Sequence, residues 1–220
     1  ARVRWVTHEE NVGPVGNFNR CLTLARGHYI KILCADDLLY PDCVRRQMDI
    51  LEADRDERLA LVSCSRDIVD DRGKVRMRPD GLREEGVIPA RRAIKLAVRS
   101  GTNPFGEPQS VLFRASLARR VGPFDASWGF CLDIDYWFRL MAHGDLYRIR
   151  EPLCAFRVSG HSWSTGLAGR QANEFTRFID AYKSGNPDAF SDYDRAIGMT
   201  KAHANGIFRR LFYSWLSFTN

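Results

Sequence analysis

Two adjacent carboxylates, Asp36 and Asp37, end the mainly apolar stretch YIKILCADD and precede Pro41. In an open α/β sheet, ligands bind beyond the carboxyl ends of the strands. Divalent cations such as Mg²⁺ choose carboxylate oxygens together with the phosphate oxygens of a substrate. Because successive strand residues point to opposite sides, a turn at the doublet is needed to aim one acid at a cation and the other at a neighbouring hydroxyl. The pattern favours a site for a metal and a diphosphate, but the same acids could instead cap a helix that begins near Pro41.

The elements around the doublet form a β-α-β-α opening. We expect strands at residues 2–7 and 29–34, the second buried on both faces because Lys31 is its only charged residue. A helix is expected at 17–26, closed by Gly27, and another is expected to begin near Pro41. The apolar face of that second helix should consist of Val44, Met48 and Leu51.

The strand and helix signals continue to about residue 165 and then become helical only. Further strands are expected at 59–64, 110–114, 145–149 and 154–158, with a hairpin turn at Asp71-Arg72-Gly73. Further helices are expected at 89–99, capped by Gly101, at 115–121 and at 133–143. We therefore predict an α/β body over residues 1–165, a mixed sheet flanked by helices, and a mainly helical extension over 166–220.

Composition places the chain among ordinary globular proteins. Its 220 residues are 45% hydrophobic and 27% charged, enough to bury one sizeable core. The net charge of +6 comes from 33 basic residues interspersed with 27 acidic ones, so nucleic acid is not an expected partner. The six cysteines form no CxxC pair, and no stretch is long and apolar enough to cross a bilayer. We predict reduced thiols and a cytoplasmic location, with the inner face of the membrane as a further site.

Three stretches carry a resemblance to a known family. They are ENVGPVGNFNRCLTLARGHYIKILCADDLLYPD (10–42), GEPQSVLFRASLARRVGPFD (106–125) and LDIDYWFRLMAHGDLYRIREPLCAFRVSGHSWS (132–164). In this order they resemble a family 2 glycosyltransferase with the GT-A fold, over about residues 3–165. The resemblance implies an enzyme that moves a sugar from a nucleotide-diphosphate donor to a saccharide or lipid-linked acceptor, as in polysaccharide biosynthesis.

The resemblance also implies roles for individual residues. Asp37 would bind Mg²⁺ or Mn²⁺, and Asp36 would contact the ribose or complete the metal shell. Asp133 falls where the family places its catalytic base. His161, which follows Arg157, falls in a loop that supplies a further metal or diphosphate contact in some members. The remaining contacts to the nucleotide would come from Asn11, Asn19 and Arg157.

An inverting transfer requires these two kinds of acid. One carboxylate takes the proton of the acceptor hydroxyl, and a cation stabilises the charge of the departing diphosphate. Two carboxylates alone could also serve a glycoside hydrolase. The adjacent doublet favours the metal-dependent transferase.

Three departures from the family pattern leave a second function open. Cys34 occupies a position that is often acidic, and Leu132 replaces the acidic neighbour of Asp133. The chain also begins near the third strand of the family, so the resemblance implies a strand and a helix upstream. A non-catalytic remnant that binds a nucleotide or glycan is therefore the alternative. A Rossmann-type dehydrogenase ranks last because no GxGxxG follows a strand.

Other side chains admit two interpretations each. Trp128 could stack on a sugar or simply pack, and Glu107 and Gln109 could bind acceptor hydroxyls or be solvated in a loop. Asp135 lies about 200° around the helix from Asp133, which favours a solvated or helix-dipole role. The histidines without a partner at metal spacing are expected at the surface: His8, His28, His143 and His203.

The C-terminal segment 201–220 contains basic residues and no acidic residue. Its apolar residues at helical spacing are Ile207, Phe208, Leu211, Phe212, Trp215 and Leu216. We expect this stripe to pack on the body. The alternative is an amphipathic helix in peripheral contact with an anionic membrane.

Overall fold

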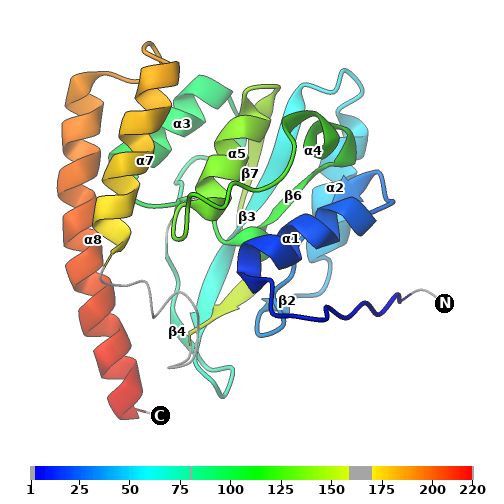
Figure 1. Cartoon of the computed structure of the whole chain (residues 1–220), viewed down its shortest axis with the longest axis horizontal. Helices are drawn as coiled ribbons and strands as arrows, with labels where there is room; N and C mark the ends of the chain where they lie inside the picture. The colour runs from blue at the N-terminus through cyan, green and yellow to red at the C-terminus, as the bar shows by residue number, and fades with distance from the viewer. Residues whose placement is uncertain (1–2, 80, 159–169, 220) are drawn as a thin grey trace.

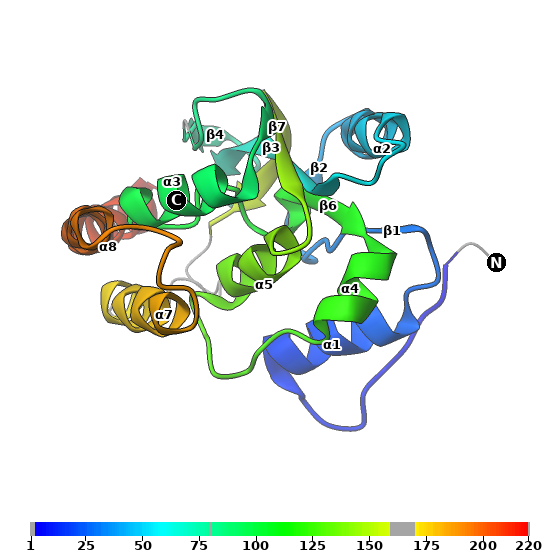
Figure 2. The ribbon, with the colours of Figure 1, turned by 90° about the horizontal axis from the view of Figure 1, so that it is seen from above.

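The computed structural model describes residues 3–79, 81–158 and 170–219, with side chains up to residue 212. A mixed β-sheet forms the centre (Figure 1). Helix α2 covers one face, while the other described helices lie on the opposite face, with α7 and α8 side by side at the end where α3 lies (Figure 2). The α/β body and the helical C-terminal segment are therefore both present as expected.

The sheet has the strand order β1-β6-β3-β7-β2, with β4 paired to β3 and β5 paired to β7. The central strands β3 and β7 run parallel, and the other pairs are antiparallel. The strands are β1 (Tyr29–Ile30), β2 (Leu38–Leu39), β3 (Leu59–Val69), β4 (Val75–Met77), β5 (Gly86–Ile88), β6 (Val111–Arg114) and β7 (Asp145–Arg157). The expected turn between residues 71 and 73 does connect the hairpin β3–β4.

The helices agree with the apolar periodicity of the sequence. They are α1 (Gly13–Leu24), α2 (Cys43–Ala53), α3 (Ala90–Ser100), α4 (Ala115–Val121), α5 (Leu132–Met141), α7 (Gln171–Gly185) and α8 (Asp192–Thr219), with a 3₁₀ turn at Pro108–Ser110. Gly101 ends α3 in the left-handed conformation, as the sequence predicts.

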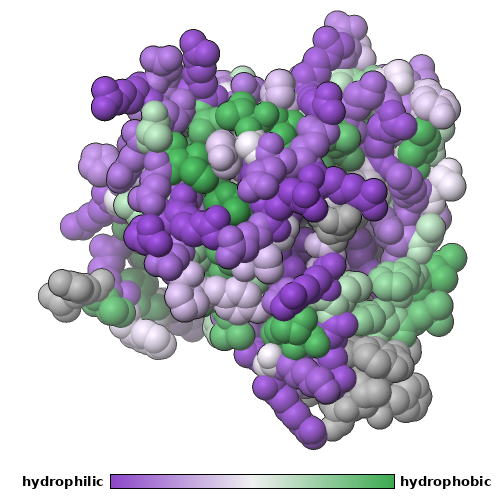
Figure 3. Space-filling view, turned by 180° about the vertical axis from the view of Figure 1, so that it is seen from behind, coloured by the Kyte–Doolittle hydropathy of each residue, from purple (hydrophilic) through white to green (hydrophobic). Residues whose placement is uncertain are grey.

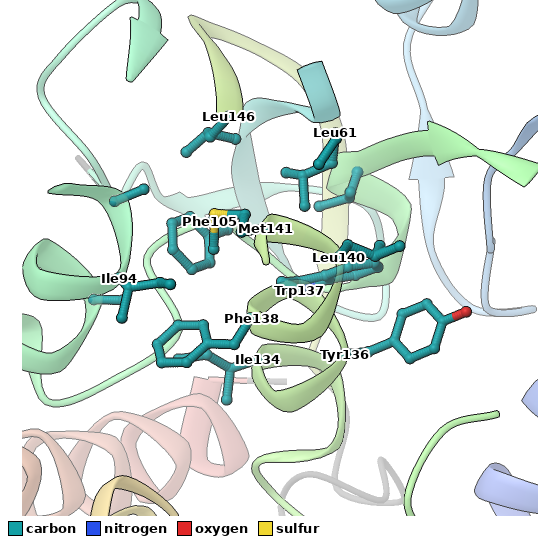
Figure 4. Close-up of a cluster of buried hydrophobic side chains, with 14 of the residues drawn as sticks. Leu61, Ile94, Phe105, Ile134, Tyr136, Trp137, Phe138, Leu140, Met141 and Leu146 are labelled. Atoms are coloured by element: carbon teal, nitrogen blue, oxygen red, sulfur yellow. The ribbon is translucent and has the colours of Figure 1, made fainter. Parts of the chain in front are cut away.

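Helix α5 lies at the centre of the larger core (Figure 4). Its aromatic residues Tyr136, Trp137 and Phe138 are at most 1% exposed. Figure 4 shows Phe138 beside Phe105 and Trp137 on the side of Leu61, whereas Tyr136 points to the other side of the helix. Helix α5 is thus buried on most of its surface, and the α7 residues Phe175, Phe178 and Ile179 belong to the same core. The expected boundary near residue 165 falls outside the described residues and stays a prediction.

Two expected strands in the first third of the chain are wrong or too long. Residues 3–7 form no strand, and Val3 and Trp5 are 80% and 86% exposed. An extended segment becomes a strand only by pairing, and no described strand pairs with these residues. The strand expected at 29–34 is limited to β1, because pairing with β6 ends at Ile30. Leu33 is half exposed, so that segment is not buried on both faces.

The strands expected at 145–149 and 154–158 are one continuous strand, β7. Pro152, which has no N–H to donate, lies opposite Ser65, where the β3–β7 register shifts. The irregularity absorbs the proline without ending the strand. This long parallel pairing could not be inferred from either half alone.

Helix boundaries differ modestly from expectation. Helix α1 begins at Gly13 and is capped by Ala25 instead of Gly27. Helix α2 buries Cys43, Gln47 and Leu51, whereas Val44 is 39% exposed. The polar Gln47 belongs to the buried face because its amide donates to the carbonyls of Val62 and Ser110.

Helices α3 and α8 approach each other closely through glycine. A Cβ at Gly198 would lie 2.2 Å from the carbonyl oxygen of Val98, whereas a Cβ at Gly206 in the same helix has Ala172 Cβ at 4.0 Å as its nearest neighbour. We predict that G198A destabilises the fold by about 1–3 kcal/mol through overpacking. The control G206A should stabilise by up to about 1 kcal/mol, since alanine favours helix. Urea denaturation measures both; equal effects of the two substitutions would contradict the close approach.

Candidate active site

A pocket of about 230 Å³ lies where the turn before β2, the strand β3 and the start of α5 meet. Acidic side chains from three separate segments line it. They are Asp36 and Asp37, Glu107, and Asp133. The pocket therefore collects the doublet and the expected base in one place.

The doublet lies in a turn that leads into β2, not at the end of a long strand. The N–H of Asp37 donates to the carbonyl of Cys34 at 3.2 Å, and β2 then pairs with β7. Asp36 is exposed, whereas Asp37 is 7% exposed. Burial raises the pKa of Asp37 to about 7, and the neighbouring Asp36 raises it further, although the N–H of Arg157 opposes the shift. A cation bound here would stabilise the ionised carboxylate.

Arg157 contacts the doublet from outside the pocket. Its N–H donates to Asp37 Oδ1 at 3.0 Å, and its guanidinium donates to the carbonyls of Asp36, Asp70 and Asp71 at 2.8–2.9 Å. Arg157 does not line the pocket. Its guanidinium fastens the doublet to the β3–β4 turn and leaves Asp36 and Asp37 to face the pocket.

Asp133 lies in the first turn of α5, and both of its carboxylate oxygens accept hydrogen bonds. Oδ2 accepts from Asn103 Nδ2 at 2.8 Å, and Oδ1 accepts from the N–H of Ile134 at 2.7 Å. Burial raises the pKa of Asp133 to about 7, and the charge of Glu107 raises it further. The hydrogen bonds favour ionisation but are outweighed by burial. A carboxylate with such a pKa can exchange a proton near neutral pH.

Glu107 is not a solvated loop residue. It forms an ion pair with Arg66, whose Nη2 lies 2.9 Å from Glu107 Oε1, and both side chains are largely buried. Arg66 interrupts the apolar strand β3, and both residues line the pocket. The pair adds one cationic and one anionic group to the pocket that holds the doublet and Asp133.

The C-terminal helices also reach the pocket. Gln171 of α7 and Arg209 of α8 line it, and Arg209 donates to Gln171 and to the hydroxyl of Thr102. The guanidinium of Arg209 also lies 5.0 Å from the ring centroid of Phe130. The site is therefore built from the α/β body and the helical extension together.

The asparagines expected at the nucleotide do not line this pocket. Asn11 is exposed and accepts the N–H of Gly13 at 2.9 Å. Asn19 makes two hydrogen bonds with the backbone of Phe124, one in each direction. Asn19 thus joins α1 to the loop before α5, and its amide is occupied by that contact.

Two of the expected substrate-binding residues also lie apart from the pocket lining. Gln109 is fully buried, and neither of its amide atoms has a hydrogen-bond partner among the described residues. Trp128 is half-buried and packs edge-on against Phe178, with the Arg177 guanidinium 5.7 Å from its ring centroid. Its neighbours Gly129 and Phe130 line the pocket instead. His161 lies outside the described residues.

Asp135 was expected to be solvated or to serve the helix dipole; its side chain is largely buried, but it does lie in the first turn of α5. It forms an ion pair with Arg139, one turn further along α5, at 2.9 Å. It lies outside the pocket lining, which agrees with the expected separation from Asp133.

The comparisons with known proteins bear on this geometry. The model of the family "Glycosyl transferase family 2" matches residues 1–122, which is more than half of the chain. The chain belongs to glycosyltransferase family 2.

A Mycobacterium tuberculosis relative, "Uncharacterized protein MT1568", is 26% identical over 79% of this chain and 56% of its own length. "Uncharacterized glycosyltransferase RT0329" of Rickettsia typhi is 24% identical over 76% of this chain and 51% of its own. This family 2 chain spans about half the length of the curated relatives it matches.

A solved structure supports the fold. The mannosyltransferase PcManGT of Pyrobaculum calidifontis, solved with GDP-Man and Mn²⁺, is similar with a TM-score of 0.51 and 19% identity. The match covers 96% of this chain and 53% of that protein. It confirms the expected GT-A-like fold with a mixed sheet.

The residues of the family 2 chain fit a divalent cation. Asp37 and Asp36 offer hard oxygen ligands beside the pocket, and two protein carboxylates plus substrate phosphates are a usual Mg²⁺ environment. Within the described residues, no group of three or more acidic, histidine or cysteine side chains forms a complete protein cage. Cys34 does not replace the missing acid, because burial and the charge of Asp37 raise its pKa to about 12 and keep the thiol neutral.

Several residues of this family 2 site could not be assigned from the sequence. Arg66 was detectable only as a charge inside the apolar strand LALVSCSRDIV. Asn103 lies in a glycine- and proline-rich loop, and Arg209 lies more than 70 residues after Asp133, so neither had a local signal. Their roles depend on contacts between segments far apart in the chain.

None of the helices that the structure describes is long and apolar enough to span a bilayer.

Proposed function

We propose that this chain transfers a glycosyl group, with inversion, from a nucleoside-diphosphate sugar to an acceptor hydroxyl. The observation that carries the proposal is the single pocket that joins the Asp36-Asp37 doublet to Asp133. Family membership supports glycosyl transfer in general. The inverting form is supported because the acid pair suited to a cation, Asp36-Asp37, is separate from Asp133, the acid suited to accept a proton.

On the donor side, Asp37 and Asp36 would hold Mg²⁺ or Mn²⁺. When bound, the cation supplies positive charge to the diphosphate of the leaving group. The Mn²⁺ and GDP-Man in the solved mannosyltransferase support a nucleotide-sugar donor and a divalent cation. The contacts of Arg157 keep the doublet in the turn and limit its rearrangement when a ligand enters.

On the acceptor side, Asp133 takes the proton of the attacking hydroxyl. Asn103 donates to Asp133 Oδ2 and fixes the carboxylate toward the pocket. The nearby Glu107 raises the pKa of Asp133, which makes it a stronger proton acceptor. The acceptor is a saccharide or a lipid-linked saccharide, as expected for polysaccharide biosynthesis, and nucleic acid is not among the proposed partners.

Titration calorimetry with UDP, GDP and dTDP, each with and without Mn²⁺, tests the proposal. We expect one nucleotide to bind more tightly with Mn²⁺, and the matching sugar nucleotide to be hydrolysed or its sugar transferred. Binding without any turnover would support the alternative, an inactive nucleotide- or glycan-binding remnant of the same fold. No binding of any nucleotide would overturn both.

We also propose that the end of α8 contacts a membrane. The packing expected for the 201–220 stripe is wrong for three residues, because Ile207, Phe208 and Leu211 are 63%, 53% and 67% exposed. Apolar side chains gather over this part of α8 at the lower right of Figure 3. The apolar surface lies beside basic residues of the same helix, the combination that binds anionic lipid surfaces.

Cosedimentation with vesicles that contain phosphatidylglycerol measures this contact. We expect L211E to lower the bound fraction several-fold, since it places a negative charge in the exposed apolar surface. A204E adds the same charge at an exposed alanine of the same helix and should bind like the wild type. Equal losses in L211E and A204E would point to net charge alone and remove the apolar contact.

A further inference from the structure

Arg148 of β7 carries a buried charge with no counter-ion among the residues that the structure describes. Its side chain is fully buried, and its guanidinium donates to the hydroxyls of Ser63 and Ser65 at 3.3 and 2.7 Å. Neither a carboxylate contact nor a hydrogen-bond partner for its Nε is found within the described ranges. Burial lowers its pKa to about 10, and the positive charge of Arg66 lowers it further. Buried charges are normally paired, so an uncompensated guanidinium here requires an explanation.

A second cavity lies beside Ser65, one of the two serines that accept a hydrogen bond from Arg148. It has a volume of about 390 Å³, and its polar lining consists of Ser65, Arg66, Arg78, Arg150 and Glu151. Ser65, the hydroxyl that accepts from Arg148, lies in this lining. Because the Ser65 oxygen accepts from Arg148, its hydroxyl hydrogen can be donated to a ligand in the cavity.

The charges around this cavity do not cancel. Arg66 pairs with Glu107, Arg78 with Asp67, and Glu151 with Arg46. In the part of the chain that the structure describes, Arg148 and Arg150 have no ion pair. Arg150 therefore lines the cavity as a cation without an ion pair among the described residues, and the buried Arg148 adds a second uncompensated charge through its hydrogen bond to Ser65. This arrangement favours an anion with more than one charge.

We propose that this cavity is a second anion site, separate from the donor pocket, that binds a phosphate or diphosphate group. Ser65 and Arg150 donate to the phosphate oxygens. Arg148 does not touch the phosphate, but its positive charge stabilises the bound anion through the hydrogen bond to Ser65. Arg66 lines both cavities, so the phosphate lies next to the reacting groups. Resting on the proposed function, the bound group is the phosphate of a phosphorylated acceptor.

The protein is titrated with inorganic phosphate, and chloride keeps the ionic strength constant. The measured quantity is the shift of the thermal unfolding midpoint. A ligand that binds the folded state raises this midpoint in a saturable way. We expect R150Q to weaken the apparent phosphate affinity about tenfold, the effect of losing one charge-assisted hydrogen bond. S65A should weaken it as well, without changing the net charge. These variants avoid the buried Arg148, whose replacement could prevent folding.

The matched control is R55Q, which removes the charge of another exposed arginine, in the turn that follows α2. It should bind phosphate like the wild type. Equal affinities in R150Q, S65A and R55Q would overturn the site.

Saturating nucleoside diphosphate with Mg²⁺ distinguishes the two sources of the phosphate group. If a second phosphorylated molecule occupies the cavity, phosphate still raises the unfolding midpoint when the nucleotide is bound. Complete loss of the phosphate effect would place phosphate in the donor pocket and overturn a separate site. Because the measurement needs no turnover, it can succeed even if glycosyl transfer is not observed.

Discussion

Replacing Asp133 by Asn is expected to lower the turnover number about 10³-fold, within the range for loss of a general base. Asparagine has nearly the same shape but cannot accept the proton of the acceptor hydroxyl. Donor binding should change little, because the doublet is a separate part of the pocket. Steady-state turnover of the sugar nucleotide and calorimetry with the nucleoside diphosphate measure the two quantities separately.

The control for Asp133 is Asp135→Asn, the same chemical change two residues further along α5. Asp135 is paired with Arg139 and lies outside the pocket, so its replacement should leave turnover within a few-fold of the wild type. If D133N kept wild-type turnover, Asp133 would lose its role as base. Equal losses in both variants would indicate a general effect on α5.

The pH dependence of D133N provides a second readout. Because the pKa of Asp133 is raised to about 7, the wild-type rate should rise with pH through about 7 as the base becomes ionised. The folded state holds the proton of Asp133 more tightly than the unfolded state does. The contribution of Asp133 to the free energy of unfolding should therefore decrease as pH rises from about 4 to about 7. D133N should remove this part of both pH dependences.

Replacing Asp37 by Asn is expected to remove the dependence of nucleotide binding on Mn²⁺ and to lower turnover about 10³-fold or more. Asn replaces an anionic metal ligand by a neutral amide, while its Oδ1 can still accept the N–H of Arg157. The turn should therefore keep its structure. Calorimetry with and without Mn²⁺ measures the change, and EDTA should reduce wild-type affinity to the level of the variant.

Asp71→Asn is the matched control for Asp37, since it removes one negative charge from the neighbouring β3–β4 turn. The Asp71 side chain is exposed, and its carbonyl, not its carboxylate, accepts from Arg157. D71N should retain the wild-type response to Mn²⁺. An unchanged Mn²⁺ response in D37N would show that the cation is bound elsewhere or is not required.

The sequence was sufficient for features that depend on neighbours in the chain. The apolar periodicity of α5 and the αL glycine that ends α3 are local properties, and both are confirmed. The doublet and Asp133 could be selected because they stand in motifs that resemble the family, although nothing local showed that they share a pocket. The same local reasoning placed the strand at residues 3–7 wrongly, since apolar alternation shows that a segment can pair but not whether a partner exists.

What only the tertiary structure decided are the contacts between distant segments. Arg157 was expected at the nucleotide but holds the doublet through backbone carbonyls, and Asn19 joins α1 to a loop more than 100 residues away. The orientation of Asp133 by Asn103 and the hydrogen bonds of the buried Arg148 to serine hydroxyls likewise follow from how β3, β7 and the loops pack. A side chain's partners and its burial set its pKa and its role. Those are properties of the packed chain, which the order of residues along one segment does not contain.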